Sequence, residues 1–423
     1  YLFAHNDGDG IFGENGDQDI IKCGSYTGNG SADGPEIDLG FEPQWILAKN
    51  AGGTGDWLLF DTMRGWPVTN DNQRLRPNST AAEDTRDYYS PTSTGFKVTA
   101  ATTTVNGSGT NYIYIAIRRG PMKTPTSGTE VFHPFLGTST SDWIFDAGFP
   151  VDLHFYRNKS STSNWFLFDR VRGDEYVNPN LTSAGTSFTC DFDKMNYCDV
   201  SGSNISGWMT YSFRRAPGFF DVVAYTGTGS ATTVAHNLGV APELMIVKPR
   251  ALTQNWAVYY GDPTDYLHLN TDDAPADNLT YWNDTAPTAS VFSVGSAFST
   301  NYAGGYIAYL FATLDGVSKV GTYTGNGTST GNSQNIDCGF SNGARFVLIR
   351  RLESGYSWFV FDTERGIVSG DDSMLRLNLT ASELTGDVIN PYSSGFNVEW
   401  RYGSTDGANM NQNGAQYLFL AIA

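Results

Sequence analysis

A dense run of acidic and amide side chains near the start of the chain is the segment best suited to binding a metal ion. Between Asn6 and Asp19, carboxylate and amide residues alternate with glycines. A flexible loop rich in side-chain oxygens suits calcium. The candidate ligands are Asp7, Asp9, Asp17 and Asp19. The spacing departs from the EF-hand pattern, because Ile11 stands where that loop needs a ligand. A solvated linker between domains is the simpler interpretation, and we favour it.

A second pattern places an Asp three residues before an Arg-Gly pair, directly after an apolar segment. It occurs three times, as Asp61 with Arg64, Asp169 with Arg172, and Asp362 with Arg365. Such a pair could act in proton transfer. A pair that recurs in repeats is more simply an ion pair that fastens a turn, with the glycine supplying an unusual backbone angle. We therefore predict a structural role.

The remaining motifs do not indicate catalysis. The glycine-rich segment at 26–30 and 323–327 lacks the Lys-Ser/Thr and the helix that a phosphate loop requires, so we expect a hairpin turn. The five histidines are scattered, and no Gly-x-Ser-x-Gly motif is present. We expect no catalytic residue and no cofactor other than the calcium considered above. A carboxylate pair of the glycosidase type stays open, because its members can lie far apart in the chain.

Composition limits the fold and the partners. The 423 residues are too many for one core, and abundant glycine (47 residues) with 14% aromatics suits short strands joined by turns. The net charge of −18 argues against nucleic acid, which needs a basic surface. No run of 18 apolar residues is present, so we expect no insertion into a membrane. Among the four cysteines, Cys190 and Cys198 could pair, but free thiols are the simpler prediction.

Internal repetition is the strongest signal in the sequence. An aromatic segment that begins with Trp recurs at 57–61, 165–169, 256–260 and 358–362. An apolar strand precedes each copy, and an aromatic strand closes each repeat at 112–117, 208–213, 306–311 and 417–422. We predict four repeats, at 21–120, 121–216, 217–314 and 315–423. Residues 1–20 would then be the end of a preceding repeat plus a linker.

The strand pattern predicts an all-β protein of tandem β-sandwich repeats, of the concanavalin-like or jelly-roll type. We expect Trp57 and its equivalents to anchor the core of each repeat. The closing strands are apolar on both faces, which is typical of central strands covered on both sides. Trp66, Tyr88 and Tyr89 lie between strands and could pack, stack on sugars or contact another subunit.

The repeated motifs resemble a family of uncharacterised repeat domains in virion structural proteins of tailed bacteriophages, many of them marine. The matching segments are Tyr-Thr-Gly-Asn-Gly at 26–30 and 323–327, Gly-Phe-x-Pro-x-Trp at 40–45, the Trp to Arg-Gly segments at 57–65, 165–173 and 358–366, Asn-x-Thr-Ala-x-Glu at 78–83 and 378–383, and the linker at 4–10. The second repeat departs most, since it lacks the opening turn.

The resemblance implies a structural protein in a tail fibre, spike or other surface appendage, with an adhesive, host-binding role. It implies a location on the virion surface, outside the cell. The expected partners are other virion proteins, further copies of the chain, forming a trimer by analogy with phage appendages, and a host-surface glycan. Two alternatives stay open: a secreted bacterial adhesin or carbohydrate-binding protein, and a polysaccharide depolymerase.

Overall fold

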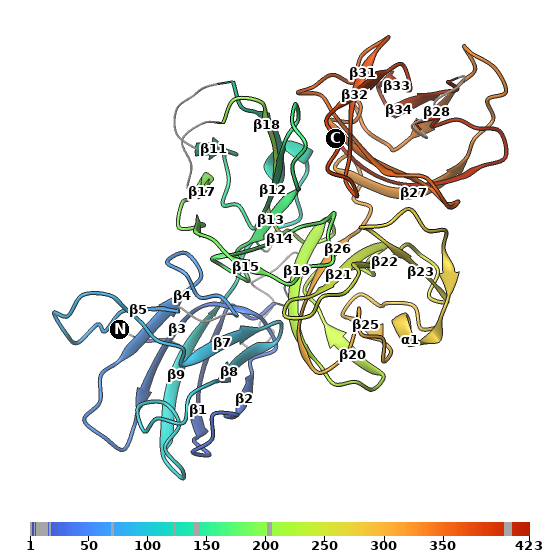
Figure 1. The fold of residues 1–423 in the computed structure, drawn as a ribbon. Coiled ribbons are helices and arrows are strands. Elements are labelled where there is room, and N and C mark those ends of the chain that lie inside the picture. Colours follow the sequence, from blue (N-terminus) through green and yellow to red (C-terminus); the bar gives the residue numbers. More distant parts are fainter. Residues whose placement is uncertain are drawn as a thin grey trace.

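The protein is built almost entirely of antiparallel β-strands. The computed structural model describes residues 2, 3, 5, 16, 18–68, 72–121, 123–138, 144–200, 205–401 and 408–423. Within these ranges the helical segments are two short turns, η1 (Gly128–Glu130) and α1 (Leu279–Trp282). None of the described helices has the length and apolarity needed to cross a membrane. The strands fall into four groups, which we call unit 1 (β1–β9), unit 2 (β10–β18), unit 3 (β19–β26) and unit 4 (β27–β35) (Figure 1).

Unit 1 consists of a large sheet and a small one. The large sheet contains, in order, β1 (Ile21–Thr27), β9 (Asn111–Arg118), β3 (Pro43–Asn50) and β4 (Leu58–Asp61). A bridge between Leu59 and Leu75 extends it towards the ribbon of β5 (Gln73–Arg74) and β6 (Asp84–Thr85). The small sheet contains β2 (Glu36–Asp38), β8 (Gly95–Val98) and β7 (Tyr89–Thr92).

Units 2 to 4 repeat this topology with six strands in each large sheet. In unit 2 the order is β10 (Phe132–Leu136), β18 (Trp208–Phe213), β12 (Leu153–Asn158), β13 (Phe166–Asp169), β14 (Glu175–Val177) and β15 (Thr186–Ser187). In unit 3 it is β19 (Phe220–Gly227), β26 (Gly304–Phe311), β21 (Leu244–Pro249), β22 (Ala257–Tyr259), β23 (Asp265–His268) and β24 (Ala276–Asp277). In unit 4 it is β27 (Ser318–Thr324), β35 (Gln416–Ile422), β29 (Phe346–Arg351), β30 (Trp358–Asp362), β31 (Asp372–Arg376) and β32 (Leu384–Gly386).

The small sheets complete four sandwiches. They contain β11 (Ile144–Asp146), β17 (Tyr197–Val200) and β16 (Cys190–Asp191) in unit 2, β20 (Thr232–Ala235) and β25 (Val291–Val294) in unit 3, and β28 (Ser333–Asp337), β34 (Gly395–Glu399) and β33 (Ile389–Tyr392) in unit 4. In every unit a buried apolar cluster lies between the two sheets. The prediction of an all-β, sandwich-type protein is therefore confirmed.

The glycine-rich opening segment is not the hairpin turn that we expected. In unit 1, β1 pairs with β9 of the large sheet, whereas the following strand β2 pairs with β8 of the small sheet. The turn therefore carries the chain from one sheet to the other. A Cβ atom on Gly28 would lie 2.4 Å from the carbonyl oxygen of Gly107, so this glycine allows a close backbone approach rather than a tight reversal.

Units 2, 3 and 4 share a further apolar core in addition to their own. The faces of their large sheets that point away from the small sheets pack together, and Trp165, Trp256 and Trp358 are buried there. The prediction that these tryptophans anchor their own sandwiches is wrong: they are buried between units. Because strands alternate their side chains, each large sheet has one face for its own core and one for this shared core.

Unit 1 stands apart from this shared core. It lies at the end of the molecule opposite unit 4 and extends away from the other three units (Figure 1). Trp57 is only half-buried. The loop aromatics Trp66 and Tyr89 are buried in the unit 1 core with Tyr88 packed against it, so their role is packing.

Candidate functional site

The predicted calcium ligands are not brought together by the described structure. Asp7, Asp9 and Asp17 lie outside the described residues, and Asp19 is the one candidate within them. Across the part of the chain that the structure describes, no group of three or more His, Cys, Asp or Glu side chains could hold a metal ion. The prediction of a calcium site at the start of the chain therefore stays a prediction.

The Asp–Arg pairs are ion pairs that close the turn after the Trp strand. The Nε of Arg172 lies 2.6 Å from Oδ2 of Asp169, and the same atoms of Arg64 and Asp61 are 2.7 Å apart. The backbone N–H of Arg172 also donates to Asp169 at 2.8 Å. The following glycine, Gly173, has a φ of +67°, which a side chain would oppose. These contacts agree with the structural role that we predicted.

In units 2 and 4 these ion pairs also receive a tyrosine from a neighbouring unit. The hydroxyl of Tyr309 in unit 3 donates to Oδ2 of Asp169 at 2.7 Å. The hydroxyl of Tyr211 in unit 2 donates to Oδ2 of Asp362 at 2.7 Å. All of these side chains are buried, so each hydrogen bond to a charged oxygen fixes one unit against the next in a dry environment.

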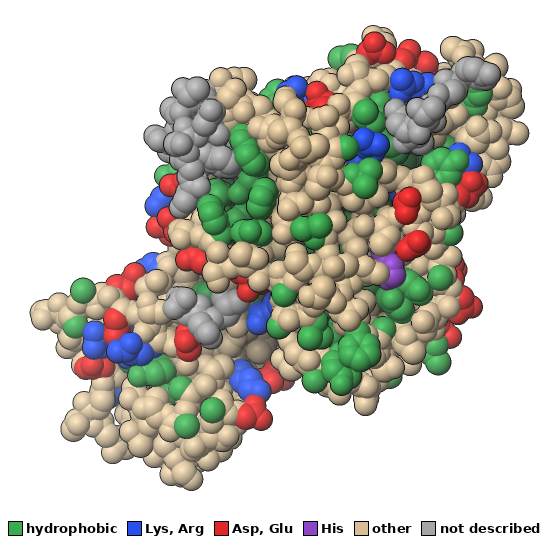
Figure 2. Space-filling view, in the orientation of Figure 1, with side chains coloured by type: hydrophobic (Ala, Val, Ile, Leu, Met, Phe, Trp, Pro, Cys, Tyr) green, Lys and Arg blue, Asp and Glu red, His purple; other side chains and the backbone are tan. Residues whose placement is uncertain are grey.

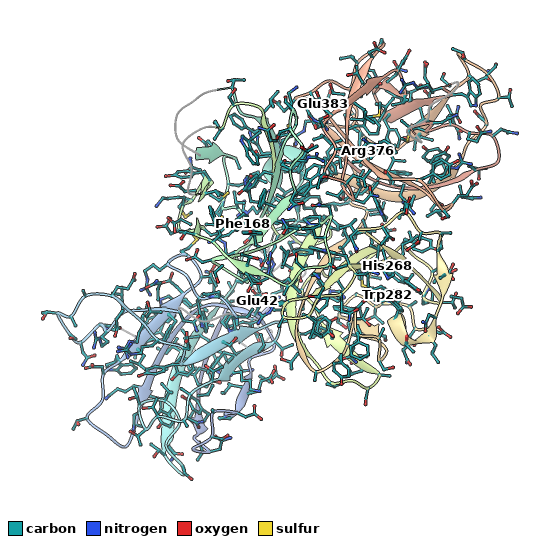
Figure 3. All side chains as sticks on the ribbon, in the orientation of Figure 1. Glu42, Phe168, His268, Trp282, Arg376 and Glu383 are labelled. Carbon is teal, nitrogen blue, oxygen red and sulfur yellow. The ribbon has the colours of Figure 1, made fainter. Side chains whose placement is uncertain are left out.

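Each tryptophan of the shared core donates its indole N–H to the backbone of a neighbouring unit. Nε1 of Trp165 lies 2.9 Å from the carbonyl oxygen of Arg376 in unit 4. Nε1 of Trp358 lies 3.1 Å from the carbonyl oxygen of His268 in unit 3. Nε1 of Trp256 lies 3.1 Å and 3.0 Å from the carbonyl oxygens of Asn178 and Leu181 in unit 2. Figure 3 labels two of these acceptor residues, Arg376 and His268.

A cation beside each tryptophan strengthens the same contact. Arg157, Lys248 and Arg350 lie 5.6 Å, 5.9 Å and 5.7 Å from the ring centres of the tryptophans of their own units. Each also donates to carbonyl oxygens of the neighbouring unit, as when Nζ of Lys248 lies 2.7 Å from the carbonyl oxygen of Thr182. Burial lowers the pKa of Lys248 to about 8 and that of Arg157 to about 10. These cations therefore serve to bind carbonyl groups of the neighbouring unit.

The contacts form a closed cycle. Unit 2 donates to unit 4, unit 4 donates to unit 3, and unit 3 donates to unit 2. In each case the tryptophan of one large sheet donates to the last residue of the fifth strand of the next large sheet, or to the residues that directly follow it. A head-to-tail interface whose rotation closes produces a ring. Units 2, 3 and 4 are therefore a pseudo-threefold ring within one chain, and we call them the three-unit ring.

One interface of the ring differs from the other two in a matched way. Unit 3 has Tyr260 where units 2 and 4 have the Asp of the ion pair, and unit 4 has Leu420 where units 2 and 3 have the donating tyrosine. Leu420 is buried in the shared core and Tyr260 packs against that core. The acceptor and the donor are thus lost together at the same interface, which leaves no unpaired charge there.

Unit 1 contacts the ring through a buried group of charges. Both terminal nitrogens of Arg215 donate to Glu42, at 2.9 Å and 2.6 Å, and its Nε donates to Asp221 at 2.8 Å. Arg119 of unit 1 adds contacts to Glu42 at 3.3 Å and to Asp221 at 3.5 Å. Figure 3 labels Glu42 where unit 1 meets the other units. Further hydrogen bonds, such as that from the N–H of Val68 to the carbonyl oxygen of Val171, also join unit 1 to the ring. Unit 1 is therefore attached by ion pairs and hydrogen bonds, and not through the face of its large sheet.

Buried asparagines that the motifs did not reveal hold the opening turns. Oδ1 of Asn106 accepts from the backbone N–H of Asn29 at 2.8 Å. Oδ1 of Asn301 and Oδ1 of Asn411 accept from the backbone N–H at the equivalent turn position of units 3 and 4, at 2.7 Å and 2.8 Å. All three asparagines are fully buried. Their recurrence shortly before each closing strand is the signal by which the sequence could have revealed them.

Three other reactive side chains, those of Cys190, Cys198 and His154, are buried inside unit 2. Cys190 and Cys198 are buried free thiols, as predicted, and they belong to the core of unit 2. His154, which is fully buried, lies with its Nδ1 3.1 Å from Oγ of Ser212. On the face shown in Figure 2, acidic and basic side chains are interspersed over the surface. The residues that recur between units thus serve contacts between strands and between units.

Comparison with known proteins adds a family assignment. A family model described as a domain of unknown function (DUF7483) matches residues 18–121 and 198–423, which include the whole of units 1, 3 and 4. The unmatched stretch covers most of unit 2, which departs most from the repeated motifs. No curated protein sequence matches the chain.

Proposed function

The chain belongs to DUF7483, a family of domains of unknown function, and we propose that it is a non-enzymatic structural protein of a bacteriophage virion. Its place would be a tail fibre, spike or other surface appendage, exposed outside the cell. Its partners would be other virion proteins, further copies of the chain and a host-surface glycan.

The observation that carries this proposal is the use of the recurring polar residues. In units 2 and 4 the aspartate and arginine after the Trp strand are paired with each other and with a tyrosine of a neighbouring unit. The side chains of these groups are buried between units. Residues that recur in several units and make the contacts between those units are typical of a structural protein. A catalytic group, by contrast, needs to be present in only one unit of the chain.

The virion location is supported by the motifs that resemble phage repeat domains, and the three-unit ring would serve as the building block of a rigid appendage. The direct test is immunogold electron microscopy of purified particles of a phage that encodes the chain. We expect gold label at a discrete appendage and the chain in the protein content of the particles. Particles that lack the chain would refute the proposal.

An assay with host-surface polysaccharide tests the non-enzymatic part separately. The purified chain is incubated with the polysaccharide, and released oligosaccharide is measured by chromatography. We expect no release, with or without added calcium. Release above that of heat-denatured chain would show a depolymerase and would overturn this part of the proposal even if the virion location held.

A further inference from the structure

Unit 1 carries an apolar sheet face that corresponds to the faces buried in the three-unit ring. We call it the outer face of unit 1. By register and sequence position its side chains correspond to residues of the shared core in units 2, 3 and 4. It consists of Trp45, Leu47, Trp57, Leu59, Ile113, Ile115 and Ile117. None of them belongs to the buried core of unit 1 within the described residues.

Part of this face is exposed where its counterparts are buried: Ile113 is exposed, and the other six side chains are half-buried. Ile113 is 40% exposed, whereas the equivalent Met209, Ile307 and Leu418 are 0%, 0% and 2% exposed. A contiguous apolar surface of this kind on a folded protein marks an interaction site. The difference does not arise from the side chains, because Ile113 is as apolar as its three counterparts.

The polar groups of the ring interface are also present in unit 1. They form the hydrogen bond within their own unit but not the one to a neighbouring unit, as far as the described residues show. Nζ of Lys49 donates to the carbonyl oxygen of Gly55 at 2.6 Å, as Lys248 does to Gln254 in unit 3. Lys248 adds a bond to the neighbouring unit, for which Lys49 has no counterpart among the described residues. The indole N–H of Trp57 likewise donates to no described acceptor.

The accepting half of the interface is present as well. In unit 4, the carbonyl oxygen of Arg376 accepts from Trp165 and also from the N–H of Leu379. In unit 1 the carbonyl oxygen of Arg76 accepts from the N–H of Ser79 in the same way, and residues 77–80 are exposed. Unit 1 therefore offers both a donor end and an acceptor segment on one surface.

We propose that the outer faces of unit 1 from three copies of the chain pack together in a second ring with the geometry of the three-unit ring. A surface with both halves of a head-to-tail contact is complementary to itself, and the rotation observed in the internal ring closes after three units. The proposal rests on this surface alone and does not depend on the virion role.

One substitution defines a difference between the two rings. Ile115 stands where Tyr211 and Tyr309 donate to an ion pair, so the second ring lacks that hydrogen bond. At the internal interface of Leu420 with Tyr260 the tyrosine donor is also absent, but there the accepting aspartate is absent too. Asp61 is already paired with Arg64, so packing leaves no unpaired carboxylate.

The test is the oligomeric state of the chain in solution, measured by sedimentation velocity over a range of concentrations. We expect trimers of wild-type chain and monomers of the Ile113→Glu variant, because a charge in the centre of an apolar interface is strongly unfavourable. The control is Val240→Glu in unit 3, since Val240 is also 40% exposed and lies outside the outer face of unit 1. It should stay trimeric.

Monomeric wild-type chain, or an oligomer that Ile113→Glu leaves intact, would overturn the proposal. Reaction with a thiol reagent gives an independent measurement. Cys23 lies on β1, beside the outer face, and is half-buried, whereas Cys190, Cys198 and Cys338 are buried. We expect the reaction of Cys23 to slow severalfold as wild-type concentration rises and to stay constant for Ile113→Glu. A Cys23 reaction rate that is independent of protein concentration in both wild type and Ile113→Glu would also overturn the proposal.

Discussion

Tyr211 of unit 2 and Asp362 of unit 4 are 151 residues apart in the chain, and their hydroxyl and carboxylate oxygens are 2.7 Å apart in a fully buried contact. The contact links a closing strand to the turn after a Trp strand in another unit. The contact shows that one repeated motif, the closing strand, binds a different repeated motif, the turn after the Trp strand, in another unit.

Tyr211→Phe should destabilise the ring by about 1–3 kcal/mol, because it removes the hydroxyl and leaves a buried carboxylate oxygen with one donor fewer. Denaturant titration followed by tryptophan fluorescence would measure this change. Tyr302→Phe is the control, since Tyr302 is 43% exposed and its hydroxyl bonds to no other unit among the described residues. Equal stability of the two variants would contradict the assigned contact.

Trp358→Ala should cost about 3–5 kcal/mol of unfolding free energy, because it opens a cavity in the shared core. The equivalent Trp57→Ala, in dilute monomeric chain, should cost less than half as much, since Trp57 is only half-buried. Thermal unfolding of the two variants compares the same residue of the repeat in its two environments. Similar losses of stability would mean that Trp57 is packed like its counterparts.

Asn301→Ala should destabilise unit 3 by about 1–3 kcal/mol for each buried backbone group that it leaves without a partner. The side chain of Asn301 accepts from the N–H of Thr228 and donates to the carbonyl oxygens of Ser230 and Gly295. Hydrogen exchange of the Thr228 amide measures the effect locally. Asn397→Ala, which removes an exposed hydrogen bond to Asn335, should leave that amide protected.

Asp372 should make the stability of unit 4 depend on pH. Burial raises the pKa of Asp372 to about 6, although backbone N–H groups of Val368, Val388 and Ile389 oppose the rise. Its pKa in the unfolded chain is about 3.9, so the folded state binds the proton more tightly between these values. Protonated Asp372 therefore contributes fully to the free energy of unfolding below pH about 4, and this contribution is lost as the pH rises to about 6.

Asp372→Asn removes this titration. The melting temperature of the variant relative to wild type should therefore rise as the pH increases from 4 to 7, as measured by differential scanning calorimetry. Asp371→Asn is the neighbouring control, because Asp371 is exposed. A difference between Asp372→Asn and wild type that stays constant across this range would show that Asp372 does not titrate there.

The sequence was sufficient to predict the strands, because the repeat aligned four copies of each segment. The closing strand expected at 306–311 is β26 (Gly304–Phe311), and the one expected at 417–422 is β35 (Gln416–Ile422). Turn residues and the alternation of apolar and polar residues are local features of the sequence. They therefore indicate a strand without any knowledge of the strands with which it pairs. This explains why the sandwich class was predictable.

The sequence could not indicate which apolar face of a strand meets which partner. Alternation gives a strand two faces, and in units 2 to 4 both faces are apolar, so the assignment of Trp165 and Trp358 to their own cores was wrong. A signal was available in the cations Lys49, Arg157, Lys248 and Arg350, which recur at the same spacing before each Trp. A cation in an apolar strand must reach an acceptor, and for the three cations of the ring an acceptor lies in the neighbouring unit.

Because the three-unit ring is continuous along one polypeptide, its assembly does not depend on encounters between separate molecules. Tethered partners meet at an effective concentration set by the connecting chain, so dilution cannot dissociate the ring. Its three interfaces are also free to differ, which identical subunits around a symmetry axis cannot do. The Leu420 and Tyr260 interface is an example of that freedom.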